Sequence, residues 1–178
     1  TIEVFYNLRT DLDKLNYAIE ITKIVRDVTD ENENCYKILQ MLLNTLYTLS
    51  ETDKNIDLVI STFKLKVLCF LGFTPRIMEC VNCKEKNNLK YFSLKNDGFK
   101  CENCGRLDKG AISISESTVS AIRYIVMAPA KKLFSFSLKL IFTYFANNSS
   151  LLNLLEKPWK VCSFVIFIEV AVPETLGI

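Results

Sequence analysis

The sequence predicts a mainly α-helical protein, a helical bundle with an inserted β-hairpin that carries a four-cysteine zinc site. Apolar residues recur at helical spacing in three segments between residues 10 and 71, and again after residue 115. Between these regions, four cysteines form the pattern C-x2-C-x17-C-x2-C. Hydrophobic residues make up 49% of the 178-residue chain, which is enough for a substantial core and argues against global disorder.

The first helix is expected to begin at Thr10 and to end before the polar linker at 30–34. Thr10 can cap the helix, and Asp13, three residues later, is a weak capping-box partner. The residues expected to face the core lie on one helical face: Leu12, Leu15, Ile19, Thr22 and Val25.

A second and a third helix are expected over 35–49 and 56–71. The core face of the second comprises Cys35, Ile38, Leu39, Leu42, Leu43, Leu46 and Leu49. The third should end at Gly72, with Pro75 preventing its continuation. Lys64 and Lys66 flank its apolar face, where they either extend to the surface or begin a basic surface. Short connections imply antiparallel packing in a bundle.

The four cysteines, Cys80, Cys83, Cys101 and Cys104, have the spacing of a tetrahedral Zn2+ site with four thiolate ligands. A turn at 97–98 would join two short strands, over 89–94 and from 99 onward, and bring the cysteine pairs together. Two disulfides are an alternative, but three further cysteines in apolar segments suggest a reducing compartment. A redox C-x-x-C needs one pair in a strand-to-helix context that is missing here. The pattern therefore favours zinc.

This zinc is expected to be structural. Four cysteines leave no position for water or substrate, and the chain contains no histidine. The lack of histidine excludes His-ligated hydrolases and nucleophiles activated by histidine. One Zn2+ per chain would contribute on the order of 10 kcal/mol to folding. The sequence shows neither an open metal position nor an activated nucleophile, so we do not expect an enzyme.

After the cysteines, Ser115 is the expected N-cap of a helix that ends near Pro129. Further helical segments are expected over 137–145 and 151–155, followed by an almost wholly apolar run at 161–172 that is too short to span a membrane. The chain thus divides into a helical domain at 1–75 and 111–160, an inserted zinc ribbon at 76–110 and an apolar tail at 161–178.

The charge distribution is asymmetric although the net charge is only +2. Residues 1–62 hold eleven acidic and six basic side chains, whereas residues 63–178 hold nine acidic and sixteen basic ones. A basic second part fits either a polyanion-binding surface or ordinary solvated lysines. No signal peptide or membrane-spanning run is evident, so a soluble intracellular protein is expected.

Several segments together resemble the zinc-bearing members of the RecO family of bacterial DNA repair proteins. The similarity covers about residues 3 to 160 and is most specific where residues 63–75, ending in Gly-Phe-Thr-Pro, lead into the first cysteine pair. The other similar segments are 6–12, 16–18, 91–93, 110–115, 121–125 and 128–129.

The resemblance implies a recombination mediator, not a catalyst. Members of this family bind single- and double-stranded DNA, anneal complementary strands and work with RecR to load RecA onto DNA covered by single-strand-binding protein. They also contact the acidic tail of that protein, partly through the helical domain. The family begins with an OB-fold domain, and this chain is expected to start after it. The implied location is the bacterial cytoplasm, with the nucleoid.

The resemblance matches Cys80, Cys83, Cys101 and Cys104 to the family's zinc ligands. Basic residues near them are candidate contacts to DNA phosphates, which would give salt-dependent binding. The candidates are Arg106, Arg123, Lys131 and Lys132. The alternative hypothesis is a protein-interaction scaffold that does not bind DNA without its OB-fold.

Overall fold

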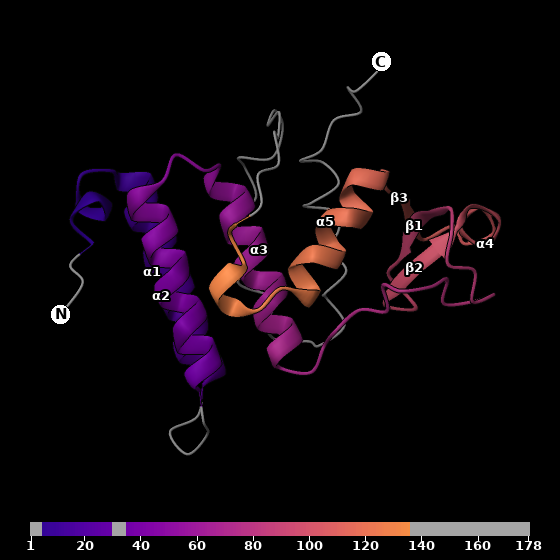
Figure 1. Cartoon of the computed structure of the whole chain (residues 1–178), viewed down its shortest axis with the longest axis horizontal. Coiled ribbons are helices and arrows are strands. Elements are labelled where there is room, and N and C mark those ends of the chain that lie inside the picture. Colours follow the sequence, from indigo (N-terminus) through magenta and orange to yellow (C-terminus); the bar gives the residue numbers. More distant parts are fainter. Residues whose placement is uncertain (1–4, 30–34, 136–178) are drawn as a thin grey trace.

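The computed structural model describes residues 5–29 and 35–135. Most of these residues are helical, and a small antiparallel sheet lies at one end of the molecule (Figure 1). The elements in chain order are η1 Tyr6–Arg9, α1 Leu12–Val28, α2 Tyr36–Glu51, α3 Ile56–Phe70, β1 Leu89–Ser93, β2 Gly98–Cys101, α4 Glu102–Arg106, β3 Ala111–Ser113, α5 Glu116–Met127 and η2 Ala130–Lys132. The predicted mainly helical class with a β-hairpin is confirmed.

Helices α1, α2 and α3 pack against one another in a bundle, and α5 packs between α3 and the sheet (Figure 1). One continuous hydrophobic core runs from the bundle into the β-strands, from Ile21 and Phe63 to Phe92 and Phe99. The rings of Phe92 and Phe99 meet edge to face, with centroids 6.0 Å apart. The sheet therefore shares its core with the helices that precede and follow it.

The N-cap of α1 is Asp11, not the predicted Thr10. The Asp11 carboxylate accepts hydrogen bonds from the backbone N–H groups of Asp13 and Lys14, which satisfies two donors of the first turn. The Thr10 hydroxyl instead donates to the carbonyl of Asn7 and closes the preceding 3-10 turn.

The predicted core face of α1 is correct only in part, because Val25 packs against the core but Thr22 is exposed. Ala18, Ile21 and Ile24 are buried, whereas Leu12 and Ile19 are 76% and 59% exposed. Both faces have helical spacing, so periodicity alone did not distinguish them. The packing of α1 against α2 and α3 determines which face is buried.

Helix α2 has a similar second apolar face. Met41, Leu42 and Leu49 are buried together with Thr45 and Thr48, whose hydroxyls donate to backbone carbonyls one turn earlier. The predicted core residues Leu39 and Leu43 are about half exposed. They lie on a face that also carries two exposed tyrosines, Tyr36 and Tyr47.

Helix α3 ends as predicted. Its last residue is Phe70, and Gly72 has a φ of 91°, which a glycine adopts without strain. At its start, the Asn55 side chain accepts from the N–H of Leu58.

The two lysines that flank the apolar face of α3 have different environments. Lys64 forms an ion pair with Glu20 of α1 at 2.6 Å. Lys66 is only 4% exposed and donates to the carbonyls of Ile125 and Val126 at the end of α5, at 3.1 and 2.6 Å. Burial lowers the pKa of its ammonium group. Lys66 thus satisfies C-terminal carbonyls of α5 and joins that helix to α3.

The sheet has the strand order β2-β1-β3, all antiparallel. The hairpin between β1 and β2 was predicted, but β3 was not. At the predicted turn, Asp97 takes the positive φ of 47°. Gly98 is needed for a different reason: a Cβ there would lie 2.5 Å from the carbonyl oxygen of Arg76.

Helix α5 begins at the predicted cap, since the Ser115 hydroxyl accepts from the N–H of Thr118. It ends at Met127, before Pro129. The segments predicted over 137–145, 151–155 and 161–172 lie outside the described residues. Within residues 5–29 and 35–135, no helix is both long and apolar enough to cross a bilayer.

Candidate metal centre

The first cysteine pair lies in a tight turn before β1. The N–H of Cys80 donates to the carbonyl of Glu85 at 2.7 Å, and the N–H of Lys84 donates back to the carbonyl of Cys80 at 3.0 Å. Lys84 has a φ of 65°, a conformation that reverses the chain directly after Cys83. The turn directs both sulfur atoms toward the second pair.

The second cysteine pair lies where β2 passes into the short helix α4. The prediction that no C-x-x-C of this chain has a strand-to-helix context was therefore wrong, although this pair shares its site with Cys80 and Cys83. Cys101 is the last residue of β2 and the N-terminal cap of α4, and Cys104 lies within that helix. The N–H of Glu102 donates to the carbonyl of Asn88, which holds this corner against the segment that leads into β1.

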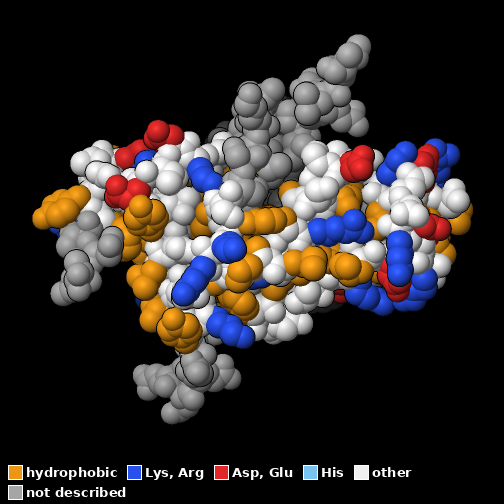
Figure 2. Space-filling view, in the orientation of Figure 1, with side chains coloured by type: hydrophobic (Ala, Val, Ile, Leu, Met, Phe, Trp, Pro, Cys, Tyr) orange, Lys and Arg blue, Asp and Glu red, His pale blue; other side chains and the backbone are white. Residues whose placement is uncertain are grey.

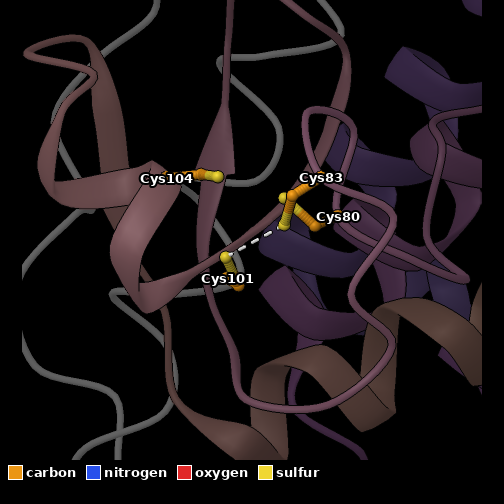
Figure 3. Close-up of side chains that lie close together, drawn as sticks. All are labelled: Cys80, Cys83, Cys101 and Cys104. Atoms are coloured by element: carbon orange, nitrogen blue, oxygen red, sulfur yellow. Dashed lines mark hydrogen bonds between the residues drawn. The ribbon is translucent and has the colours of Figure 1, made fainter.

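The four cysteine sulfurs come together in one place (Figure 3). All four Sγ atoms lie within 4.8 Å of one another, and those of Cys83 and Cys101 are 3.5 Å apart. A tetrahedral zinc with Zn–S bonds of about 2.3 Å requires S···S separations of about 3.8 Å. A disulfide would need about 2.05 Å, and the four cysteines are unbonded. The spacing of the sulfurs thus fits a shared metal ion.

The protonation of the cysteines supports the same conclusion. Burial opposes ionisation of Cys80, but backbone N–H groups of Cys83, Cys101 and Asn82 favour its thiolate and lower its pKa to about 6. Hydrogen bonds with the Cys101 and Cys83 sulfurs raise the pKa of Cys104 to about 12. Four thiols so close together cannot all ionise without a cation, and a divalent metal removes that obstacle.

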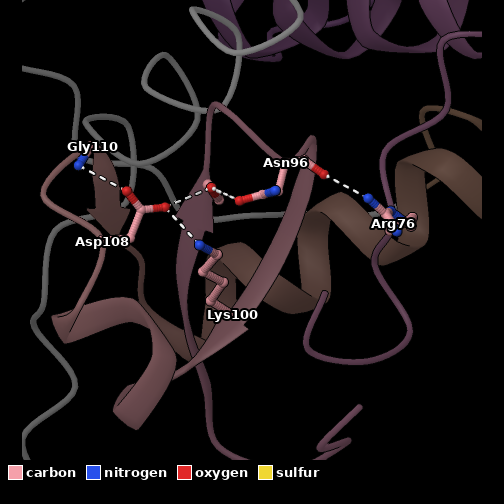
Figure 4. Close-up of polar contacts among 6 residues, drawn as sticks. Arg76, Asn96, Lys100, Asp108 and Gly110 are labelled. Carbon is pink, nitrogen blue, oxygen red and sulfur yellow. Dashed lines mark hydrogen bonds and ion pairs between the residues drawn. The ribbon is translucent and has the colours of Figure 1, made fainter. Parts of the chain in front are cut away.

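A polar network supports the strands next to the cysteines (Figure 4). Lys100 is buried, and its ammonium group forms an ion pair with Asp108 at 2.7 Å. The same carboxylate oxygen accepts from the Ser93 hydroxyl, while the other accepts from the N–H of Gly110. The bond from Lys100 and those from Ser93 and Gly110 lower the pKa of Asp108 to about 2. The network joins β1, β2 and the loop that leads to β3.

Gly105 follows the fourth cysteine directly and lies against the ring of Tyr91. A Cβ at this position would be 2.2 Å from Cδ2 of that ring. The close packing of α4 on β1 therefore requires glycine here. Sequence reasoning identified neither this contact nor the Asp108 network.

Hydrogen bonds from Arg123 on α5 hold the segment before the cysteines against that helix. Its Nε donates to the carbonyl of Ile77 at 2.9 Å and its Nη2 to that of Met78 at 3.3 Å. Its guanidinium carbon lies 6.0 Å from the centroid of the Phe99 ring. This candidate DNA contact thus also has a structural role that the sequence did not indicate.

The four candidate DNA contacts do not form one cluster. Arg106 forms an ion pair with Glu102 of its own helix, α4, in the cysteine-bearing region. Lys131 and Lys132 are exposed in η2, which packs against α2 through a hydrogen bond from Asn44 to Ala130. Arg123 lies between these two regions, on α5.

The family model and the curated relatives that match this chain all point to the same family. Residues 9–141 match the model of the family described as Recombination protein O C terminal. The DNA repair protein RecO of Acetivibrio thermocellus is 40% identical over 136 residues, which cover 76% of this chain and 54% of that protein. The RecO proteins of Alkaliphilus metalliredigens and a Thermoanaerobacter species are 30% and 31% identical, over 70% and 74% of this chain and 51% and 53% of theirs.

The chain spans about half the length of these curated relatives. The family model describes the C-terminal part of RecO proteins, and the residues of this chain that match it include all four cysteines. On these grounds, the chain belongs to the RecO family and matches its C-terminal region.

Proposed function

We propose that this chain is the C-terminal part of a DNA repair and recombination mediator that holds one structural Zn2+. Its family membership carries the proposal, since relatives at 30–40% identity are DNA repair proteins. Cys80, Cys83, Cys101 and Cys104 would bind the zinc through four thiolates. With its coordination sphere filled, the metal would stabilise the fold and would take no part in catalysis.

The mediator would bind single- and double-stranded DNA and anneal complementary strands. With RecR, it would help to load RecA onto DNA covered by single-strand-binding protein, whose acidic tail would be a further partner. An OB-fold domain in the other half of the protein would supply part of the DNA contact. We place this activity in the bacterial cytoplasm, at the nucleoid.

The charges of this chain predict only modest DNA affinity for the piece alone. Residues 76–110 carry eight basic and five acidic side chains. Four thiolates around one Zn2+ add two negative charges, so the net charge of this segment falls from +3 to +1 when the metal binds. Of the candidate contacts, Lys131 and Lys132 are exposed, whereas Arg106 is paired with Glu102 and Arg123 donates to backbone carbonyls.

A second function, a scaffold for protein partners without DNA binding of its own, is favoured by one observation. Large apolar side chains are exposed on α1 and α2, including Ile19, Leu43 and Tyr47, and such surfaces often meet other proteins. In this case the OB-fold half would carry the DNA affinity.

Binding of single-stranded DNA by the zinc-loaded chain, measured across a salt series, separates the two functions. If the chain itself contacts DNA, affinity falls steeply with salt, and replacing Lys131 and Lys132 by alanine reduces the log–log slope by about 1.4, or about 0.7 for each lost phosphate contact. No binding at low salt, with zinc bound and the chain folded, would refute DNA contact by this half and support the scaffold.

A further inference from the structure

Cys83 is the most accessible of the four predicted zinc ligands. Cys80 and Cys101 are buried and Cys104 is half-buried, whereas Cys83 is exposed. It belongs to a run of exposed residues, 82–88, that lies against the start of α4. Figure 2 shows many charged side chains on the surface of this end of the molecule. A small polar molecule in water can therefore reach the sulfur of Cys83 without displacing any part of the core.

The sulfur of Cys101 lies in contact with that of Cys83. The two Sγ atoms are 3.5 Å apart, although the residues are 18 positions apart in the chain (Figure 3). A disulfide bond joins two sulfurs at about 2.05 Å, so a small movement brings them to bonding distance. Cys101 is fixed at the end of β2 by its pairing with Leu89, so Cys83, in the exposed run, is the residue that moves.

Hydrogen peroxide is an oxidant that suits an exposed thiolate with a second sulfur beside it. The Cys83 thiolate attacks one peroxide oxygen, which breaks the O–O bond and gives a sulfenic acid and a hydroxide ion. The Cys101 thiolate then attacks the Cys83 sulfur, forms the S–S bond and expels a second hydroxide ion. Two thiolates thus lose two electrons in total, and one peroxide molecule takes them up as it becomes two hydroxide ions.

We propose that Cys83 is a peroxide-reactive site and that its oxidation to a disulfide with Cys101 releases the metal from the four-cysteine centre. The cysteines that remain, Cys80 and Cys104, offer two thiolates where a structural zinc takes four ligands. The inference rests on the zinc centre of the proposed function and adds a modification site to it.

Oxidation would also change the charge of this end of the molecule. With the metal lost, one disulfide formed and two neutral thiols left, the net charge of residues 76–110 rises from +1 to +3. The more basic surface would attract polyanions more strongly. The new disulfide would still join the first cysteine turn to β2, so reduction in the presence of zinc should restore the centre.

The test treats the zinc-loaded chain with hydrogen peroxide. Released zinc is measured with a colorimetric chelator, sulfenic acid is trapped with dimedone, and disulfides are mapped by tandem mass spectrometry after alkylation and trypsin cleavage. Trypsin cuts after Arg76, Lys84, Lys100 and Arg106, so the first cysteine pair lies in peptide 77–84 and the second in peptide 101–106. The expected product is these two peptides joined through Cys83 and Cys101, formed in step with zinc release.

Two variants keep a four-ligand site and separate the roles of its members. Cys83→His and Cys104→His each leave three thiolates and one imidazole, a ligand set that structural zinc sites also use. Cys83→His is expected to slow zinc release several-fold and to give no disulfide between the two peptides. Cys104→His is the matched control and is expected to release zinc at the rate of the unchanged chain. If either variant fails to bind zinc, the mapping on the unchanged chain decides.

Three results would overturn the inference. In the first, the two variants release zinc at equal rates. In the second, dimedone labels another cysteine of the centre in place of Cys83. In the third, the disulfide forms within one peptide, as between Cys80 and Cys83 or between Cys101 and Cys104.

The zinc content of the reduced chain separates this inference from the proposed function. A folded, reduced chain that binds no zinc refutes the proposed metal centre, and the peroxide site with it. Bound zinc that peroxide does not release refutes only the peroxide site.

Discussion

A substitution at Arg123 tests whether this basic side chain stabilises the fold or contacts DNA. Replacing it by methionine keeps much of the aliphatic stem but removes the donors to Ile77 and Met78 and the charge near Phe99. We expect the free energy of unfolding to fall while DNA affinity changes little, because the guanidinium is already engaged with backbone carbonyls.

The magnitude follows from the contacts. A hydrogen bond from a charged donor contributes roughly 1.5–3 kcal/mol. The hydrogen bond to Ile77 is short and its acceptor residue is buried, so we assign it the whole of this free energy. The longer, exposed hydrogen bond to Met78 adds little stability. The ring contact with Phe99 adds about 0.5 kcal/mol. The total loss is about 2–3.5 kcal/mol.

Urea denaturation of the zinc-loaded chain, followed by far-UV circular dichroism, measures this loss. Arg106→Met is the matched control, because Arg106 is exposed and its ion pair is with Glu102 of its own helix, so its removal should change stability by less than about 0.5 kcal/mol. Equal unfolding midpoints for the two variants, with a DNA salt slope reduced by about 1 only in Arg123→Met, would refute the structural role.

Three further predictions concern the metal, the packing of α4 and the pH dependence of the bundle. Cys101→Ser should release zinc and loosen residues 76–112 while the helices of residues 10–71 remain, as metal analysis with circular dichroism would show; full retention of zinc would contradict its role as a ligand. Gly105→Ala should destabilise the chain by about 1–3 kcal/mol because its Cβ meets the Tyr91 ring, whereas Gly110→Ala, whose nearest contact is at 3.6 Å, should change the urea midpoint little; equal midpoints would contradict the clash. Burial and the neighbouring Asp57 raise the pKa of Tyr17 to about 12, so its contribution is complete below about pH 10 and is lost as the pH rises toward 12. The stability difference between the unchanged chain and Tyr17→Phe should therefore shrink over that range, and a constant difference would rule this out.

The features that the sequence by itself determined depend on near neighbours in the chain. The cysteine spacing indicated a four-sulfur site, and Gly72 and Ser115 marked a helix end and a helix start. In each case a turn or cap needs particular residues within a few positions, so the local pattern carries the information. The same holds for the hairpin between β1 and β2.

Only the tertiary structure decided which of two apolar faces of α1 is buried. The stripe containing Leu12 and Ile19 and the face containing Ile21 and Ile24 share the same period, and only the neighbouring helices distinguish them. The sequence also did not reveal the structural roles of Arg123 and Asp108, because their partners are distant in the chain. Arg123 binds Ile77, 46 residues away, and Asp108 binds Ser93, 15 residues away. Contacts between distant segments form where the packed core brings those segments together, and no local pattern encodes that meeting.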